Sequence, residues 1–233
     1  MSAKELFPNV KTFLLDCDGL LWYNYQVINN ANVSVKSLRN HGYNVYFVTN
    51  TTLKNSVEIL EKLHHLRFEA CQDEIFCPSL VMAHHLKSLN FQKSVYVIGY
   101  RSIISELNLV GINGYDDDDL IKIESTNPGT EIEIGAVIIG HDISYKDRKV
   151  HRAIKYLQCP ETLYLSSGVH YGSNHVDPPV STVGKTVEMI KESCSIMPEL
   201  FAKPSSIMWD FILKRYALLY QIKPGSRNHL YGR

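Results

Sequence analysis

The chain has 233 residues, with 24 Lys and Arg against 24 Asp and Glu, so its formal charge at pH 7 is zero. This length can bury a substantial core, in one domain or in a domain that carries a second one. The balanced charge argues against a nucleic-acid partner. No apolar stretch approaches the roughly 20 residues that span a bilayer. The N-terminal sequence has no apolar signal region, so we expect a cytoplasmic protein without a membrane partner.

Five cysteines are scattered along the chain and form no CxxC pair. This pattern argues against a disulfide framework and against a zinc site. We therefore expect free thiols at Cys17, Cys71, Cys77, Cys159 and Cys194.

The stretch KTFLLDCDGLLW, residues 11–22, contains an apolar run that stops at two aspartates and a glycine. A short apolar run bounded by glycine predicts a buried strand. Asp16 and Asp18 then follow the carboxyl end of a strand, where open α/β sheets place their reactive groups. Gly19 permits a sharp turn, so both carboxylates can line the mouth of a pocket. The alternative is a strand followed by a solvated acidic turn.

A second strand with a polar end follows the first. Residues 33–42 predict a short helix that ends near Gly42, and residues 45–48 predict a buried strand that ends at Thr49 and Asn50. Two such strands separated by a helix indicate a βαβ unit, and hence a parallel sheet with a site at one edge.

The rest of the chain continues this alternation. We expect helices over residues 53–68, 79–89, 102–111, 144–157 and 182–194, and strands over residues 94–99, 135–140 and 162–167. Four aspartates at residues 116–119 lack the ligand spacing of a calcium loop, so we expect a solvated loop there.

Lys203 precedes Pro204 at the start of the last predicted helix. Proline is favoured at the first helical position. The helix dipole opposes a cation at that end, unless the cation and the helix bind the same anion. We therefore expect Lys203 to bind an anion, with an ordinary surface lysine as the alternative.

Three features occur in this order: Asp16-x-Asp18-Gly19, Thr49-Asn50 and Lys203-Pro204. Together they resemble the haloacid dehalogenase superfamily of phosphatases. Within it, the chain is similar to the group of 4-nitrophenylphosphatases, phosphoglycolate phosphatases and pyridoxal phosphatases. The resemblance implies an α/β fold with a Rossmann-like core and a parallel sheet at residues 1–79 and 189–233, and an inserted α/β cap at residues 80–188.

The resemblance also implies a function, a magnesium-dependent phosphatase of small phosphomonoesters such as 2-phosphoglycolate or pyridoxal phosphate. Asp16 would be the nucleophile that forms an aspartyl-phosphate, and Asp18 the general acid and base. Thr49, Asn50 and Lys203 would bind the phosphoryl group. Mg²⁺ would bind to Asp16 and to the backbone carbonyl of Asp18. The implied partners are a small phosphorylated metabolite and a second copy of the chain, bound through the cap.

Two parts of the family pattern differ in this chain. In the family, a strand ending in Gly-Asp and a second Asp follow the lysine helix and complete the magnesium site, but no acidic residue follows Asp210 here. We therefore expect a shortened core sheet and no third metal carboxylate. The cap turns that contact the substrate in the family read SSGVH (166–170) and PPVSTVG (178–184) in this chain, so the family's substrate contacts at these turns do not carry over to it.

Two alternatives to an active phosphatase follow from these differences. One is a family member with impaired catalysis that binds a phosphate or a protein. The other is a truncated or alternatively spliced form.

Overall fold

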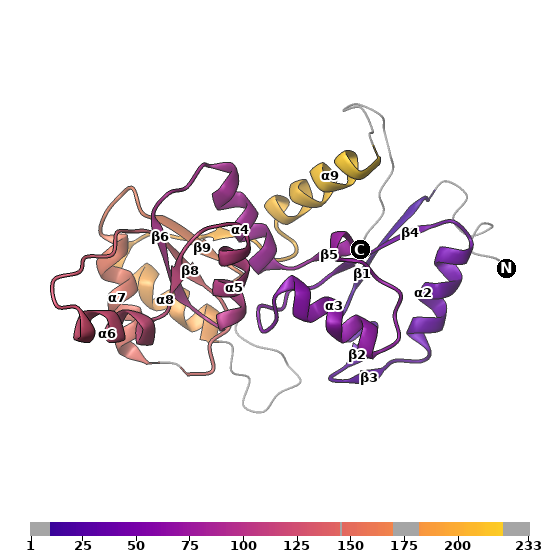
Figure 1. Ribbon diagram of the computed structural model, residues 1–233, viewed down its shortest axis with the longest axis horizontal. Helices are drawn as coiled ribbons and strands as arrows, with labels where there is room; N and C mark the ends of the chain where they lie inside the picture. The colour runs from indigo at the N-terminus through magenta and orange to yellow at the C-terminus, as the bar shows by residue number, and fades with distance from the viewer. Residues whose placement is uncertain (1–9, 145, 170–181, 221–233) are drawn as a thin grey trace. The chain divides into compact units, whose positions relative to one another are not determined.

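The computed structural model describes residues 10–144, 146–169 and 182–220 (Figure 1). The chain divides into two compact units. The first consists of Met1–Thr49, Ser56–Phe76 and Asp210–Arg233, and the second of Asn50–Asn55 and Cys77–Trp209. The predicted boundaries of a core at residues 1–79 and 189–233 and a cap at residues 80–188 stay a prediction.

The first unit contains a three-stranded parallel sheet in the order β1-β4-β5. β1 (Thr12–Asp16) pairs with β4 (Asn44–Val48), and β4 pairs with β5 (Ile75–Phe76). Among the residues that the structure describes, β1 is thus an edge strand. The two predicted strands and their parallel arrangement are confirmed.

Two helices accompany this sheet. α2 (Ala31–Asn40) ends as predicted, because Gly42 has a φ of +82° just beyond its last turn. α3 (Ser56–His65) is shorter than the predicted helix at both ends. A hairpin of β2 (Trp22–Tyr23) and β3 (Gln26–Val27) and a 3₁₀ turn at Gln72–Glu74 complete the unit.

The second unit contains a five-stranded parallel sheet in the order β10-β9-β8-β6-β7. Its strands are β6 (Ser94–Ile98), β7 (Gly114–Tyr115), β8 (Ile134–Ile139), β9 (Leu163–Ser166) and β10 (Glu199–Leu200). The long strands are almost wholly apolar, as expected for a parallel sheet covered on both faces. The three predicted strands in this part of the chain are confirmed.

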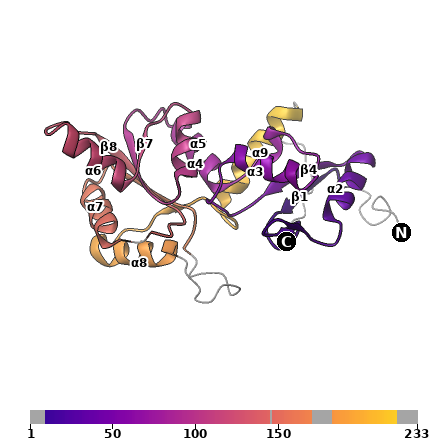
Figure 2. The same ribbon diagram turned by 60° about the horizontal axis from the view of Figure 1, so that its bottom comes forward.

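Five helices lie within this unit: α4 (Pro78–Ser88), α5 (Arg101–Leu109), α6 (Asp117–Thr126), α7 (Asp147–Leu157) and α8 (Thr182–Cys194). One face of the sheet packs against α7 and α8 in a core that includes Val137, Ile139, Val150 and Ile190. Figures 1 and 2 show α4 and α5 on the opposite side of the sheet. Helices on both faces account for the burial of residues 135–139 in the central strand β8.

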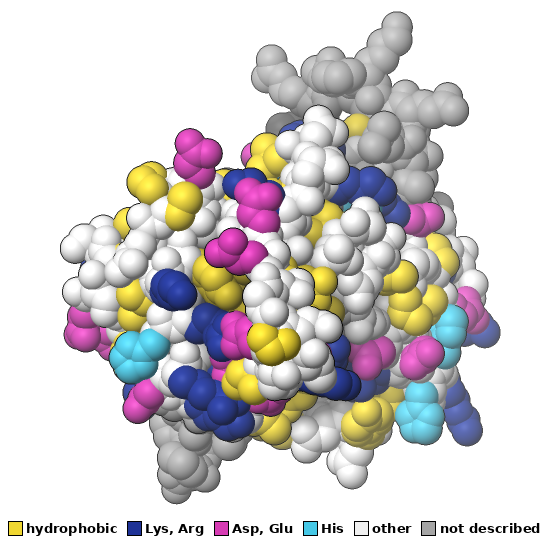
Figure 3. Space-filling view, turned by 60° about the vertical axis from the view of Figure 1, so that its left-hand side comes forward, with side chains coloured by type: hydrophobic (Ala, Val, Ile, Leu, Met, Phe, Trp, Pro, Cys, Tyr) yellow, Lys and Arg dark blue, Asp and Glu magenta, His cyan; other side chains and the backbone are white. Residues whose placement is uncertain are grey.

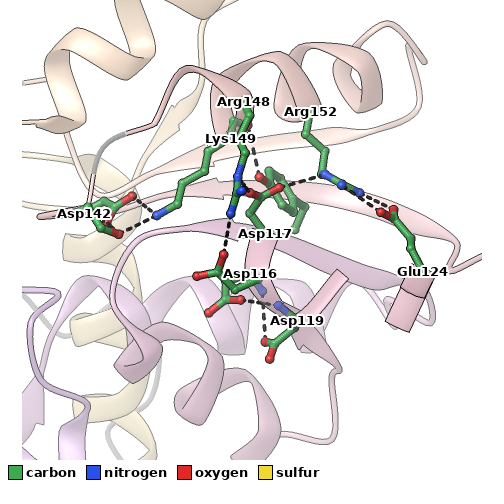
Figure 4. A network of polar contacts seen from close by, with 11 residues as sticks. Asp116, Asp117, Asp119, Glu124, Asp142, Arg148, Lys149 and Arg152 are labelled. Atoms are coloured by element: carbon green, nitrogen blue, oxygen red, sulfur yellow. Dashed lines mark hydrogen bonds and ion pairs between the residues drawn. The ribbon is translucent and has the colours of Figure 1, made fainter. Parts of the chain in front are cut away.

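The prediction of a solvated loop at residues 116–119 is wrong, because these aspartates begin α6 (Figure 4). Asp116 caps the helix by accepting the backbone N–H of Asp119 at 2.8 Å. Asp117 is 1% exposed and lies between Arg148 at 2.5 Å and Arg152 at 3.0 Å. Negative charge is favourable at a helix N-terminus, and two arginines of α7 compensate for the burial of Asp117.

The prediction that Pro204 opens the last helix is also wrong. α9 (Ser206–Tyr220) begins two residues later, and the peptide bond between Lys203 and Pro204 is cis. The Ser205 hydroxyl accepts the backbone N–H of Ile207 at 3.1 Å. Ser205 is therefore the capping residue, which fixes the start of α9.

The structure shows where the cysteines and the charged side chains lie. None of the five cysteines, all of them among the described residues, takes part in a disulfide bond. On the face drawn in Figure 3, basic and acidic side chains are interspersed. Of the helices in the described ranges, none has the length and apolar character needed to cross a membrane.

Candidate active site

Asp16 is the last residue of β1 and is exposed. The backbone N–H of the fully buried Cys17 donates to Asp16 Oδ1 at 2.8 Å. Asp16 pairs with Val48 across the parallel ladder, and Thr49 follows Val48 directly. Asp16 at the end of β1 and Thr49 directly after β4 thus both lie at the carboxyl ends of neighbouring parallel strands, as the βαβ pattern predicts.

A sharp turn after Asp16 positions Asp18. The backbone N–H of Leu21 donates to the carbonyl of Cys17, and the N–H of Gly19 donates to the carbonyl of Trp22, both at 2.9 Å. Gly19 has a φ of +84°, a conformation that residues with a Cβ rarely adopt. The predicted turn at Gly19 is confirmed.

Three donors surround the carboxylate of Asp18. Trp22 Nε1 donates to Oδ1 at 2.7 Å, and the Thr49 hydroxyl donates to Oδ2 at 3.2 Å. The ammonium of Lys62 lies 3.7 Å from Oδ1. Thr49 is itself 2% exposed, and its backbone N–H donates to the carbonyl of Phe76. The structure therefore brings Asp18 and Thr49 together.

Sequence reasoning missed Trp22 and Lys62 at this site. Trp22 ends the apolar stretch that carries the aspartates, and a tryptophan in such a stretch is expected to be a residue of the hydrophobic core. Lys62 lies on α3, where a lysine gives no local signal of a site. Both residues reach Asp18 only through the hairpin turn and the packing of α3.

The other two predicted site residues, Asn50 and Lys203, form a pair within the second unit. The side-chain amide of Asn50 donates to the carbonyl of Lys203 at 3.2 Å and accepts its backbone N–H at 2.8 Å. This reciprocal contact fixes the backbone at Lys203. The predicted roles of Asn50 and Lys203 in phosphate binding stay predictions.

The segment that begins with Asn50 is anchored at the carboxyl ends of the second sheet. The Thr52 hydroxyl accepts the backbone N–H of His141 at 3.0 Å. The backbone carbonyl of Thr52 accepts the Ser102 hydroxyl at 2.5 Å. A Cβ on Gly140 would clash with Ile103 Cδ1 and would lie 3.1 Å from Thr52 Oγ1. Gly140 therefore permits the close approach of this segment.

The predicted magnesium ligands are the carboxylate of Asp16 and the backbone carbonyl of Asp18. In the described part of the chain, no group of three or more His, Cys, Asp or Glu side chains could hold a metal ion. Mg²⁺ usually keeps several waters and binds through one or two carboxylates together with substrate phosphate oxygens. An exposed carboxylate at a strand end fits that mode of binding.

A cavity of about 1070 Å³ lies elsewhere, within the second unit. Glu124, Arg152, Lys155 and Tyr156 contribute to its lining, and none of the five predicted site residues does. The cavity therefore gives no evidence for or against the reaction predicted at Asp16 and Asp18.

Several sequence-based predictions lie outside the described residues. They concern His170, most of the PPVSTVG turn and the residues after Tyr220. In the SSGVH turn (166–170), residues 166–169 are described, and there the Ser166 hydroxyl donates to the carbonyl of Gly168 at 2.7 Å.

Comparison with known proteins identifies the family. The family model for haloacid dehalogenase-like hydrolases matches residues 13–113. Phosphoglycolate phosphatase 2 of Arabidopsis thaliana is 31% identical over 223 residues, which cover 91% of this chain and 74% of that protein. The chain belongs to the haloacid dehalogenase-like hydrolase family. Phosphoglycolate phosphatase 1A of the same plant is 30% identical over 227 residues, which cover 93% of this chain but 62% of the relative. The chain thus spans less than two thirds of that relative's length.

Solved structures confirm the fold. The p-nitrophenyl phosphatase from Archaeoglobus fulgidus matches with a TM-score of 0.77 at 19% identity, covering 90% of this chain and 75% of that one. A glycerol phosphate phosphatase from Mycobacterium tuberculosis, solved in complex with magnesium, matches with a TM-score of 0.71 at 18% identity over 90% of this chain and 60% of that one. The α/β fold of this family is therefore established for the chain.

Proposed function

We propose that the chain is a magnesium-dependent phosphatase of small phosphomonoesters that works through an aspartyl-phosphate. The observation that carries this proposal is the position of two carboxylates at the end of β1. Asp16 is exposed at the strand end, and Asp18 is held 3.2 Å from the Thr49 hydroxyl. Family membership supports the same reaction.

Each of these residues has a distinct part in the proposed reaction. The Asp16 carboxylate attacks phosphorus, and this divides one difficult displacement into two easier ones. Asp18 donates a proton to the departing oxygen and then accepts one from the attacking water. The Thr49 hydroxyl, which donates to Asp18 Oδ2 in the structure, would turn its single proton to a phosphoryl oxygen when the ester is bound.

The proposed metal ligands are Asp16 and the backbone carbonyl of Asp18. When bound, Mg²⁺ would reduce the negative charge on the phosphoryl oxygens, which otherwise repels a carboxylate nucleophile. The match to a phosphatase solved with magnesium supports this choice of metal.

The proposed substrates are small phosphate esters such as 2-phosphoglycolate or pyridoxal phosphate. The relatives named for phosphoglycolate support the first choice. Asn50 and Lys203 are proposed to bind the phosphoryl group, Lys203 as a point charge. A homodimer formed through the cap and a cytoplasmic location stay predictions.

Hydrolysis of p-nitrophenyl phosphate and 2-phosphoglycolate, with Mg²⁺ and with a chelator, tests the proposal. We expect turnover that requires Mg²⁺ and is lost in Asp16→Asn, because an amide is not a nucleophile at phosphorus. Asp147→Asn, at an exposed position in the first turn of α7, is the matched control and should retain full activity. Phosphate binding without hydrolysis in the unaltered chain would contradict the proposal and favour the non-catalytic alternative.

A further inference from the structure

The two oxygens of the Asp18 carboxylate have different neighbours. Oδ1 accepts the indole N–H of Trp22 at 2.7 Å and lies 3.7 Å from the ammonium of Lys62. Oδ2 accepts the hydroxyl of Thr49 at 3.2 Å. An indole N–H and an ammonium can only donate, whereas a hydroxyl can donate or accept. Oδ1 can therefore only accept hydrogen bonds from these two groups. Oδ2 faces the Thr49 hydroxyl, which can donate to an unprotonated Oδ2 or accept from a protonated one.

The surroundings of Trp22 leave it little freedom. Its side chain is 2% exposed, and its ring packs edge-on against Phe68 at a centroid distance of 6.0 Å. Lys62 Nζ lies 4.5 Å from the centroid of the Trp22 ring, within the range of a cation–π interaction. The Lys62 side chain is 12% exposed. Trp22 and Lys62 thus form a packed pair whose polar atoms both face Oδ1 of Asp18.

We propose that Trp22 and Lys62 are positioning residues that hold Asp18 by Oδ1, so that Oδ2 is the oxygen that transfers the proton. This inference rests on the proposed phosphatase function. In the first step, the Oδ2–H bond breaks and the proton goes to the ester oxygen, while the bond from that oxygen to phosphorus breaks and the bond from Asp16 to phosphorus forms. In the second step, water attacks phosphorus, its proton goes to Oδ2, and the bond between Asp16 and phosphorus breaks.

The test uses two leaving groups of different basicity. The alkoxide released from 2-phosphoglycolate needs a proton, whereas p-nitrophenolate is a weak base and leaves without one. A general acid contributes about 10²- to 10⁴-fold to a rate, so poor positioning of Asp18 in Trp22→Phe should slow the first turnover of 2-phosphoglycolate, in which Asp16 is phosphorylated, by about tenfold or more. The first turnover of p-nitrophenyl phosphate should change much less, whereas the second step, in which Oδ2 accepts a proton from water, is common to both substrates. Because both substrates meet the same fraction of folded protein, the ratio of the two rates is independent of any loss of stability.

Two further substitutions sharpen this test. Lys62→Met should shift the ratio in the same direction, and Lys62→Arg should restore it in part. Trp209→Phe alters the other tryptophan of the chain and is the matched control, which should leave the ratio unchanged. Equal losses in the first turnover of the two substrates in Trp22→Phe would mean that Trp22 has a purely structural role, and would overturn the proposal.

The contact itself can be measured without turnover. The chain has two tryptophans, so ¹⁵N labelling of the indoles gives two N–H signals, and Trp209→Phe assigns them. Asp18→Ala should move the Trp22 signal upfield and leave the Trp209 signal in place. An unmoved Trp22 signal would overturn the proposal whatever the activity. A chain that hydrolyses neither phosphate would overturn the proposed function and the proton-transfer role together, while the indole signal still decides whether Trp22 holds Asp18.

Discussion

The ammonium of Lys149 lies 2.7 Å from Asp142 Oδ2, and less than a tenth of either side chain is exposed (Figure 4). Lys149 also donates to the Ser144 hydroxyl at 2.8 Å, and Asp142 Oδ1 accepts the backbone N–H of Ser144 at 2.9 Å. Burial raises the pKa of Asp142, but the hydrogen bonds from Lys149 and Ser144 outweigh burial and hold this pKa below its ordinary value. The pair therefore ties the segment after β8 to α7.

Asp142→Asn should lower the free energy of unfolding at pH 7 by about 3 kcal/mol, because it leaves a buried ammonium without its carboxylate. Since the pKa of Asp142 is lowered by folding, its contribution is full above the unfolded pKa of about 3.9 and is lost as the pH falls through the folded pKa. Urea unfolding of the unaltered chain and of Asp142→Asn at pH 7 and pH 3 measures this effect. A difference in the free energy of unfolding that is the same at both pH values would contradict the account. Asp147→Asn, at an exposed position, is the control.

Gly19→Ala tests the turn that positions Asp18. The φ of +84° at Gly19 should cost a residue with a Cβ about 1 to 2 kcal/mol, although no atom obstructs the added carbon. Gly129→Ala is a matched control, since Gly129 has a φ of +97° with the same open surroundings in a loop of the second unit. We expect similar losses of stability in denaturant unfolding, and a loss of phosphatase activity in Gly19→Ala alone. Equal activity in both variants would show that the turn does not position Asp18.

The cysteines should differ in reactivity. Burial raises the pKa of the Cys77 thiol to about 12, and its side chain is 0% exposed, so little thiolate forms at pH 8. Cys71 and Cys159 are exposed. A maleimide followed by mass spectrometry should label Cys71 and Cys159 in the native protein, and Cys77 only after unfolding. Labelling of native Cys77 as fast as Cys159 would refute the burial of Cys77.

Lys203→Ala should weaken the binding of inorganic phosphate or vanadate, because it removes a cation proposed to face the anion. The contact between Asn50 and the backbone of Lys203 does not use the side chain, so the local backbone should persist. A calorimetric titration measures the affinity. Lys214→Ala, at an exposed position of α9, is the control, and equal affinities of the two variants would make Lys203 an ordinary surface lysine.

The long strands were predictable from the sequence because a parallel sheet covered on both faces requires continuous apolar strands. Most helices were predictable from apolar residues at helical spacing. β4 and β8 are examples, each an apolar run that ends in a polar or glycine residue. The two-residue strands β5, β7 and β10 were not predictable, since two residues show no periodicity. α6 was missed because its aspartates are stabilised by Arg148 and Arg152, some 30 positions away in the sequence.

The candidate site was predictable as far as its chemistry follows strand ends. Asp16 ends β1, Asp18 comes two residues later and Thr49 directly follows β4, and the structure brings Asp18 to Thr49. The contacts of Trp22 and Lys62 with Asp18 depend on how a hairpin and a helix pack. No local pattern in the sequence encodes that packing.

The most direct test of the central claim is to trap the phosphoryl group on Asp16. The full chain is mixed with 2-phosphoglycolate and Mg²⁺, quenched in acid, digested and analysed by mass spectrometry. We predict a phosphorylated peptide that contains Asp16, with the group removed by hydroxylamine and absent from Asp16→Asn. Hydrolysis that continues at the same rate in Asp16→Asn, or a phosphoryl group found on another residue, would contradict the account.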